Sequence, residues 1–391
     1  MPNPTPSRPA LLERVASIAT TIIAGRASAE SNRELEESVL GALIDTELVN
    51  LYLPRTLGGL EVDPVTCAEV VQAVAALDTA AAWMLMVANV PRFSAAAWPR
   101  GLIDEVWGAD RNTIAAISGN NPFIATPCDG GYRVTGQTGF ASGCNHARWF
   151  VAPVRIAYAV AGTSDARGML VLPIERCTIV PNWDTLGMRG TGSHDVALAD
   201  EFVEARRLVT FGASSEARNP YYNGPLYRCA RRVVFATYVP ISLAVAERAL
   251  AELEALALIK RPYAADATLA HRAFAQAKYG RALACYRGAR VYFLDALRVA
   301  FERAQNGDLP TDRERADLYL AAIHAVQSAA EAVRLVCDAA GSSTIHKQHP
   351  LERLLRDMEV LRQHGFTAEN RYANVAQVHW QAPLDYPPLL Q

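Results

Sequence analysis

Long alanine- and leucine-rich segments with regularly spaced charges fill the second half of the chain. Three of them have helical periodicity over many turns, and a shorter fourth segment follows. In that fourth segment Leu351, Leu354 and Met358 lie on one stripe of a helix, with the charged residues off it. The four segments cover residues 231–258, 267–303, 313–340 and 351–363. Helices of this length with short links predict an antiparallel four-helix bundle.

The first half of the chain changes character once. Residues 10–119 have a mostly helical pattern, with an alanine-rich helix predicted over 67–86 and breaks at Pro54 and the Gly58–Gly59 pair. From about 120 to 210 glycine becomes frequent, and short β-runs predict strands at 132–136, 149–154 and 169–173. We therefore predict a helical domain (1–119), a β-domain (120–211) and a bundle domain (212–391).

Composition and charge exclude several classes of protein. Hydrophobic residues make up 51% of the 391 residues and charged residues 20%, and the formal net charge is −2. Such a chain is globular rather than disordered or fibrous. It lacks the basic surface that nucleic acid requires, so we expect no nucleic-acid partner. The longest uncharged apolar tract, 233–246, is shorter than a membrane span, so we expect a buried helix and no membrane contact.

The seven cysteines show no C-x-x-C spacing. We expect reduced thiols and a cytoplasmic protein. The proline-rich first ten residues lack the apolar run of a secretory signal. The chain has no phosphate-binding loop, dinucleotide fingerprint or nucleophile elbow. His346 and His349 are three residues apart but lack further ligands nearby, so we predict no metal site.

Three segments, in the same order along the chain, resemble those of the acyl-CoA dehydrogenase family. They are Leu53-Pro-Arg-Thr-Leu-Gly-Gly-Leu, Leu186-Gly-Met-Arg-Gly-Thr-Gly-Ser-His-Asp-Val and Leu355-Arg-Asp-Met. The resemblance extends over about residues 31–380. It implies an α+β fold with an N-terminal helical domain, a central β-barrel or sandwich and a C-terminal four-helix bundle.

One motif points to a branch of this superfamily. Gly131-Tyr-Arg-Val-Thr-Gly-Gln-Thr-Gly-Phe-Ala-Ser-Gly-Cys-Asn-His-Ala-Arg-Trp resembles a stretch of the flavin-dependent monooxygenases that work as two-component systems. In the dehydrogenases the equivalent strand presents an aromatic, an aliphatic and a hydroxyl residue to the flavin. Phe140, Ala141 and Ser142 match these positions, which implies that they contact the cofactor.

The glutamate with which the dehydrogenases abstract a proton has no counterpart here. By the family's usual spacing it would stand nine residues after Arg356, where the chain has Gly365. Without a positioned base, proton abstraction from an acyl thioester is disfavoured. His364 lies beside this position, and the oxygenases carry a histidine at this end of the helix. The alternative is a histidine that only stabilises the helix C-terminus, where cations are favoured.

The resemblance implies the oxygenase component of a two-component monooxygenase. It would take reduced FMN or FAD from a separate flavin reductase and use O₂, through a C4a-hydroperoxide, to oxygenate an aromatic or heteroatom-bearing small molecule. Ser142 would hydrogen-bond the flavin and its adduct, and a backbone-bonded serine is the alternative. His364 would hold the peroxide or take a substrate proton.

The family also implies a substrate pocket, a phosphate contact and a homotetramer. Lys260 and Arg261 would reach the flavin phosphate, although a solvated turn is the simpler interpretation. Residues that would line the substrate pocket, each of which also suits a plain core position, are Trp83, Asn89, Phe93, Phe235 and Tyr238. Two other functions stay open at this point: an acyl-CoA dehydrogenase or related FAD oxidase with a relocated base, and a non-catalytic relic.

Overall fold

The computed structural model describes residues 5–157, 166–210 and 219–390. These residues form two compact units. The first comprises Met1–Val62, Trp83–Asp184 and Arg189–Tyr227, and the second comprises Asp63–Ala82, Thr185–Met188 and Arg228–Gln391. The expected boundary between β-domain and bundle, at 211–212, lies outside the described residues.

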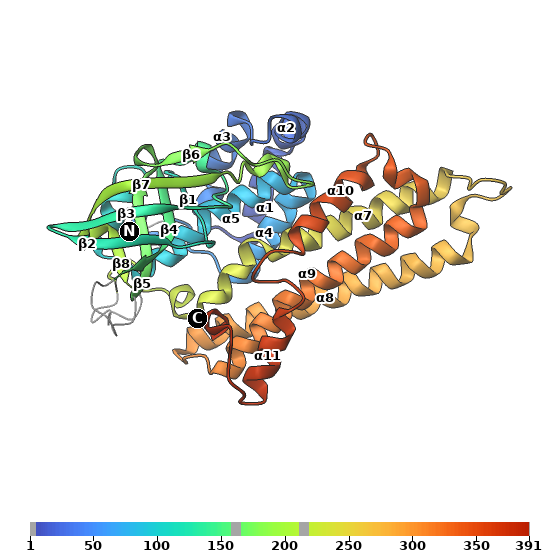
Figure 1. Ribbon diagram of the computed structural model, residues 1–391. Helices are drawn as coiled ribbons and strands as arrows, with labels where there is room; N and C mark the ends of the chain where they lie inside the picture. Colours follow the sequence, from blue (N-terminus) through green and yellow to red (C-terminus); the bar gives the residue numbers. More distant parts are fainter. Residues whose placement is uncertain (1–4, 158–165, 211–218, 391) are drawn as a thin grey trace. The chain divides into compact units, whose positions relative to one another are not determined.

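The first unit combines short helices with one mixed sheet (Figure 1). Its strands run in the order β6-β7-β3-β2-β4-β5-β8, and β1 pairs with β4. β2 and β1 run parallel to β4, and the other neighbours are antiparallel. The sheet begins before residue 120, and β3, β4 and β5 contain the three predicted strands. The strands are β1 Ala115–Ile117, β2 Phe123–Cys128, β3 Gly131–Thr138, β4 Trp149–Ile156, β5 Ala166–Pro173, β6 Thr178–Val180, β7 Asp195–Glu204 and β8 Leu208–Thr210.

The helices of this unit are short, and one of them differs from its prediction. They are α1 (Arg8–Ser17), α2 (Ala19–Asn32), α3 (Glu37–Asp45), most of α5 (Thr79–Ser94) and α6 (Arg100–Ile103). The single helix expected over 67–86 is two helices, α4 (Pro64–Leu77) and α5, because Asp78 adopts an extended conformation between them. The carboxylate of Asp78 then accepts the backbone N–H of Ala81, as an N-cap does.

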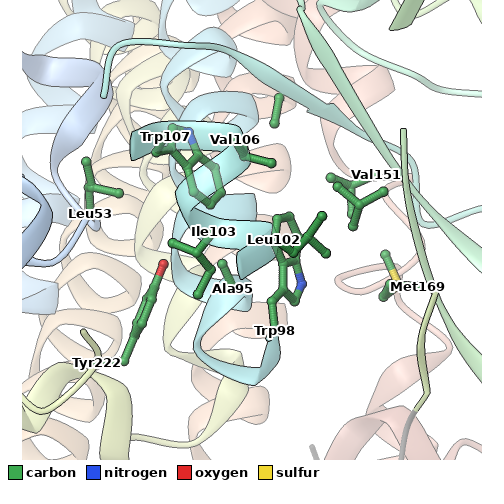
Figure 2. Close-up of a cluster of buried hydrophobic side chains, with 12 residues drawn as sticks. Leu53, Ala95, Trp98, Leu102, Ile103, Val106, Trp107, Val151, Met169 and Tyr222 are labelled. Carbon is green, nitrogen blue, oxygen red and sulfur yellow. The ribbon is translucent and has the colours of Figure 1, made fainter. Parts of the chain in front are cut away.

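Aromatic packing forms the core between residues 95–107, which include α6, and the sheet of this unit (Figure 2). Trp98 and Trp107 stack at 5.5 Å with nearly parallel rings, and Val151 and Met169 from β4 and β5 close the cluster. The fully buried guanidinium of Arg92 bonds to the carbonyls of Ala88 and Thr113, at 2.6 and 3.0 Å. Tryptophans 98 and 107 are thus packing anchors.

The second unit is a helical bundle, as the spacing predicts. Its long helices are α7 (Val239–Ile259), α8 (Ala273–Asn306), α9 (Asp312–Ala340) and α10 (Pro350–Leu361), with α4 and α11 (Arg371–His379) packed on them (Figure 1). Residues 231–237, expected at the start of α7, form a 3-10 segment instead. α10 ends at Leu361, two residues before its predicted end.

Local signals explain several ends of these helices. Thr311 and Glu314 form a capping box at the start of α9, and Gly341 follows its last residue as predicted. The ring of His349 accepts the backbone N–H of Leu351 at 3.2 Å and caps α10. His349 therefore has a structural task, and no cluster of three metal-binding side chains occurs within residues 5–157, 166–210 and 219–390.

Two helical stretches of this unit have the length and hydropathy of a membrane span. They are Arg231–Ile259 and Asp312–Ile345, and 89% and 67% of their most apolar windows are buried inside the protein. Burial of this extent is the property of core helices in a bundle, and these helices are packed against each other.

Candidate functional site

A sharp turn after β3 carries the three residues expected at the flavin. β3 ends at Thr138, so Phe140, Ala141 and Ser142 stand on a turn and not on the strand that the resemblance implied. Phe140 adopts the left-handed conformation (φ 59°) and is 61% exposed, whereas Ala141 and Ser142 are buried. The turn therefore exposes Phe140 to solvent and keeps Ser142 buried.

Backbone hydrogen bonds fix this turn against the loop before β7. The N–H of Ala141 donates to the carbonyl of His194, and the N–H of Gly143 donates to that of Thr191, both at 3.0 Å. Gly143 has φ 67°, a conformation that glycine adopts without strain. Its neighbour Ser142 is therefore held by backbone bonds on both sides.

The hydroxyl of Ser142 lies in a chain of side-chain hydrogen bonds. The indole Nε1–H of Trp83, a residue expected at the substrate pocket, donates to Ser142 Oγ at 3.0 Å. Ser142 Oγ lies 2.7 Å from Ser193 Oγ, and Ser193 Oγ lies 2.7 Å from Thr191 Oγ1. The position of Ser142 is thus set by side chains as well as by its backbone.

A tryptophan and a histidine support the exposed ring of Phe140. Trp183 contacts Phe140 edge to face at 5.8 Å, and its backbone N–H donates to His194 Nδ1 at 3.0 Å. Burial lowers the pKa of His194, which favours the neutral ring whose Nδ1 can accept that bond. An outward aromatic ring beside a fixed hydroxyl fits a flat, polar-edged ring such as the isoalloxazine of a flavin.

Asn89 and Phe93, also expected at the substrate pocket, have internal partners in the same unit. The amide of Asn89 accepts the N–H of Tyr52 at 2.9 Å and donates to the carbonyl of Leu85 at 2.8 Å. The ring of Phe93 packs against Tyr52 and Tyr227. Both residues hold α5 in place, and a contact with substrate stays a prediction for them.

A second candidate cluster lies in the helical unit, around His364. The chain turns after α10, where the N–H of His364 donates to the carbonyl of Leu361 and the carbonyl of His364 accepts the N–H of Thr367. The half-buried imidazole packs against Tyr238 at 4.9 Å and Phe366 at 5.5 Å. The helix does not continue to His364, yet the turn still directs this side chain toward apolar neighbours.

The neighbours of His364 close into a ring of contacts. Tyr238 packs on Phe235 at 5.6 Å, and Phe235 packs on Tyr319 at 5.0 Å. The guanidinium of Arg232 lies 5.9 Å from the centre of Tyr319 and 4.5 Å from that of Phe366. The ring consists of Arg232, Phe235, Tyr238, Tyr319, His364 and Phe366; we call it the histidine cluster.

The C-terminal segment fixes the cation of the histidine cluster. The Nε–H of Arg232 donates to the carbonyl of Pro388 at 2.9 Å, and Leu389 beside it is fully buried.

Burial, and secondly the charge of Arg232, lower the pKa of His364 to about 4. His364 is therefore neutral at pH 7. This direction favours a neutral imidazole over a cationic one that stabilises the helix C-terminus, and the role of His364 stays a prediction.

Lys260 and Arg261, expected at the flavin phosphate, differ in their surroundings. The ammonium of Lys260 donates to the carbonyl of Ala340 at 2.5 Å and to Ser343 Oγ at 2.7 Å, which caps the end of α9. Burial lowers its pKa. Arg261 is exposed. Contact of either residue with a phosphate stays a prediction.

Two of the resembling segments meet in the helical unit. The carboxylate of Asp357, on α10, accepts the N–H of Met188 at 2.6 Å and the hydroxyl of Thr79 at 2.7 Å. Arg356 donates to the carbonyl of Leu186 at 2.7 Å. The Arg-Asp pair thus holds residues 185–188 on α10, which is a structural task.

Comparison with known proteins agrees with these features. Residues 236–369 match the family model described as acyl-CoA dehydrogenase, C-terminal domain. XiaF from Streptomyces sp., solved in complex with FADH2 and glycerol, has the same fold, with a TM-score of 0.91 at 23% identity and 97% of both chains covered. An indole-3-acetate monooxygenase of Pseudomonas putida is 29% identical over 346 residues, 88% of this chain and 87% of that protein. This chain is similar to both of these proteins over most of its length.

A further relative supports the same branch. The oxygenase subunit HsaA of a flavin-dependent monooxygenase from Rhodococcus jostii is 28% identical over 215 residues, 54% of each chain. The predicted resemblance to flavin-dependent monooxygenases, the α+β acyl-CoA dehydrogenase fold and the prediction of a monooxygenase are confirmed. The β-part described here is one mixed sheet.

Sequence reasoning missed the partners that fix Ser142 and His364. Ser193 and Thr191 lie within the Leu186–Val196 segment that carried the resemblance, but nothing in its spacing relates their hydroxyls to Ser142. Arg232 and Phe366 carry no motif at all. Their contacts join residues that are far apart in the sequence, so only the fold brings them together.

Proposed function

We propose that the protein is the oxygenase component of a two-component monooxygenase that hydroxylates an aromatic small molecule. It would use reduced FMN or FAD supplied by a separate flavin reductase, together with O₂. The observation that carries this proposal is the turn after β3, where an outward Phe140 stands beside the fixed hydroxyl of Ser142. Bound reduced flavin supplies the electrons with which O₂ is activated.

In this proposal the Ser142 turn serves the flavin. The ring of Phe140 would cover one part of the flavin surface, and Ser142 would bond a polar atom at its edge. Ser142 suits this task because it is buried and its position is set by Trp83 and Ser193. A preorganised hydroxyl loses little entropy when the cofactor binds.

The histidine cluster would serve the substrate. A neutral imidazole accepts a proton from a phenol or a ring N–H, and this requires that it be unprotonated at working pH. Burial beside Arg232 supplies that condition. Phe235, Tyr238 and Phe366 suit an aromatic substrate. The named activity of the Pseudomonas relative, on indole-3-acetate, supports an indole as the substrate class.

The assembly and location are proposals as well. Large apolar side chains are exposed on the helical unit, among them Ile259, Phe274 and Val291, and we propose that they pack in a homotetramer. All seven cysteines are free thiols, and we propose a cytoplasmic location on that ground.

A reconstitution assay tests the proposed function. The purified protein alone should not oxidise NADH, because the chain has no dinucleotide fingerprint. With a flavin reductase, NADH, flavin and indole-3-acetate or a phenol, labelled O₂ should give labelled product. NADH oxidation by the pure protein with its own flavin would contradict the two-component assignment. Bleaching of a tightly held FAD by an acyl-CoA would establish a dehydrogenase instead.

A further inference from the structure

Three hydroxyl groups and one indole form a chain of hydrogen bonds inside the first unit, which we call the hydroxyl line. Ser142, Ser193 and Thr191 are all nine-tenths buried or more. Trp83 Nε1–H donates to Ser142 Oγ at 3.0 Å, and the spacings between successive hydroxyl oxygens are 2.7 Å. Since the backbone bonds of Ala141 and Gly143 to the facing loop fix both sides of the line, these spacings are properties of the fold.

Counting protons along this line restricts what Ser142 can offer. A serine hydroxyl has one proton and two acceptor lone pairs, and an indole N–H only donates. Trp83 therefore occupies one lone pair of Ser142. When Ser142 donates to Ser193, its second lone pair is left to accept from a third group. When Ser193 donates to Ser142, the proton of Ser142 is left to donate.

We propose that Ser193 is a positioning residue that lets Ser142 match both redox states of the flavin. The inference rests on the proposed function in one respect, the contact of Ser142 with the flavin edge. Reduced flavin carries a hydrogen on N5, and oxidised flavin presents a bare N5. Ser142 would accept from the first with its proton turned to Ser193, and donate to the second. Each hydroxyl keeps its own proton, so only the direction of the O–H bonds reverses.

Thr191 extends the line and makes the reversal possible. When Ser193 accepts from Ser142, its own proton needs an acceptor, and Thr191 Oγ1 lies 2.7 Å away. A buried O–H without an acceptor is costly, whereas an unused lone pair costs less. Loss of the Ser193 hydroxyl should therefore harm the state in which Ser142 turns its proton away from the flavin. That state is the reduced one.

Separate dissociation constants for oxidised and reduced FMN and FAD test this inference. In Ser193→Ala the constant for reduced flavin should rise about tenfold relative to that for oxidised flavin, the scale of one unsatisfied buried donor. The midpoint potential of the bound flavin should fall by about 30 mV, since tenfold corresponds to that shift in a two-electron couple. Ser193→Thr keeps the hydroxyl and should retain the wild-type ratio. Equal changes for both redox states, or no change, would overturn the inference.

The flavin-free protein offers an independent readout. With ¹⁵N-labelled tryptophan, the Nε1–H resonance of Trp83 should move in Ser193→Ala, because the acceptor strength of Ser142 changes. The resonances of Trp98 and Trp107 serve as internal controls, and an unmoved Trp83 signal would contradict the hydroxyl line. If Ser193→Ala fails to fold, Ser193→Cys, with its weak S–H donor, should change both readouts in the same direction by less.

Ser142→Ala separates failure of this inference from failure of the proposed function. If Ser142 does not contact flavin, this change should leave both dissociation constants as in the wild type. The other outcome is that Ser142→Ala weakens flavin binding but Ser193→Ala leaves the ratio of the two dissociation constants unchanged. In that case Ser142 serves the cofactor and Ser193 has no positioning role.

Discussion

At the scale of single residues, the surroundings of His364 decide what it can do. Tyr238 and Phe366 pack on its ring, and the charge of Arg232, which acts on it, has the same sign as a protonated imidazole. Both influences favour the neutral form. A histidine held neutral among aromatic side chains is suited to accept a proton, and unsuited to stabilise a helix end as a cation.

Replacement of His364 tests its part in the reaction. His364→Asn should slow product formation by about 10²-fold or more, the scale of a lost general acid–base group, and should divert NADH to hydrogen peroxide. His349→Asn is the matched control: asparagine can still cap α10, so turnover should be unchanged. Product and peroxide measured together decide the question, and an unchanged product yield in His364→Asn would remove this residue from the mechanism.

The lowered pKa of His364 predicts a pH profile. Because His364 stays neutral down to about pH 4 in the folded protein, the acid limb of product formation should lie below pH 5. Arg232→Met should raise that pKa and move the limb toward neutral pH, whereas Arg232→Lys, which keeps the charge, should not. An acid limb near 6.5 in the wild type would contradict the assignment.

The same shift has a consequence for stability. The unfolded chain binds a proton at His364 below about pH 6.5, and the folded chain does so only below about pH 4. Stability is therefore full above pH 6.5 and falls as the pH drops through that window. Urea unfolding of the wild type and of His364→Asn at pH 7.5 and 5 should show a smaller loss of stability for the variant.

Residue types in motifs were predictable from the sequence, and their partners were not. Ser142 follows from the resemblance of residues 131–149, and His364 from the absence of a glutamate at Gly365. Ser193 bonds Ser142, which is 51 residues away in the sequence. Arg232 bonds Pro388, which is 156 residues away. No periodicity or spacing encodes such pairs.

At the scale of elements, residues 185–188 and α10 form one structural feature. Asp357 and Arg356 bond the backbone of Met188 and Leu186, so the close approach of the two backbones depends on Gly187. A Cβ at Gly187 would overlap the backbone carbonyl of Arg356. Neither backbone segment can move without loss of the bonds to Asp357.

Replacement of single glycines by alanine tests the contact between Gly187 and α10. Gly187→Ala should lower the free energy of unfolding by about 1–3 kcal/mol, the usual cost of overpacking. Gly280→Ala, in the middle of α8 with no atom near its added Cβ, is the matched control and should stabilise by up to about 1 kcal/mol. Urea unfolding measures both, and equal stabilities would show that α10 and residues 185–188 separate without cost.

Element types were predicted well where periodicity was long, and less well at their ends. The three long bundle helices and three strands agree with the sequence. The helix expected over 67–86 is broken at Asp78, since a single side chain there caps α5. α10 ends at Leu361 because the chain turns at His364 to bury its ring. Such endings depend on tertiary contacts that propensity does not contain.

At the scale of the whole molecule, exposed apolar surface is unevenly distributed. α8 exposes Phe274 and Val291, and the end of α7 exposes Leu258 and Ile259. In the first unit Ile23 is one of the few large aliphatic side chains exposed to this degree. Large apolar side chains that are exposed can pack in an association surface, and we therefore propose that the assembly contacts lie on the helical unit.

Charge substitutions on α8 test that assignment. The wild type should elute as a species of about four times 42.4 kDa, and Phe274→Glu with Val291→Glu should lower this mass, because a buried unpaired carboxylate opposes association. Ile23→Glu, an exposed apolar position of the other unit, is the matched control and should leave the mass unchanged. Light scattering over a range of protein concentrations measures all three. A monomeric wild type, or a tetramer that tolerates both glutamates, would show that α8 takes no part in assembly.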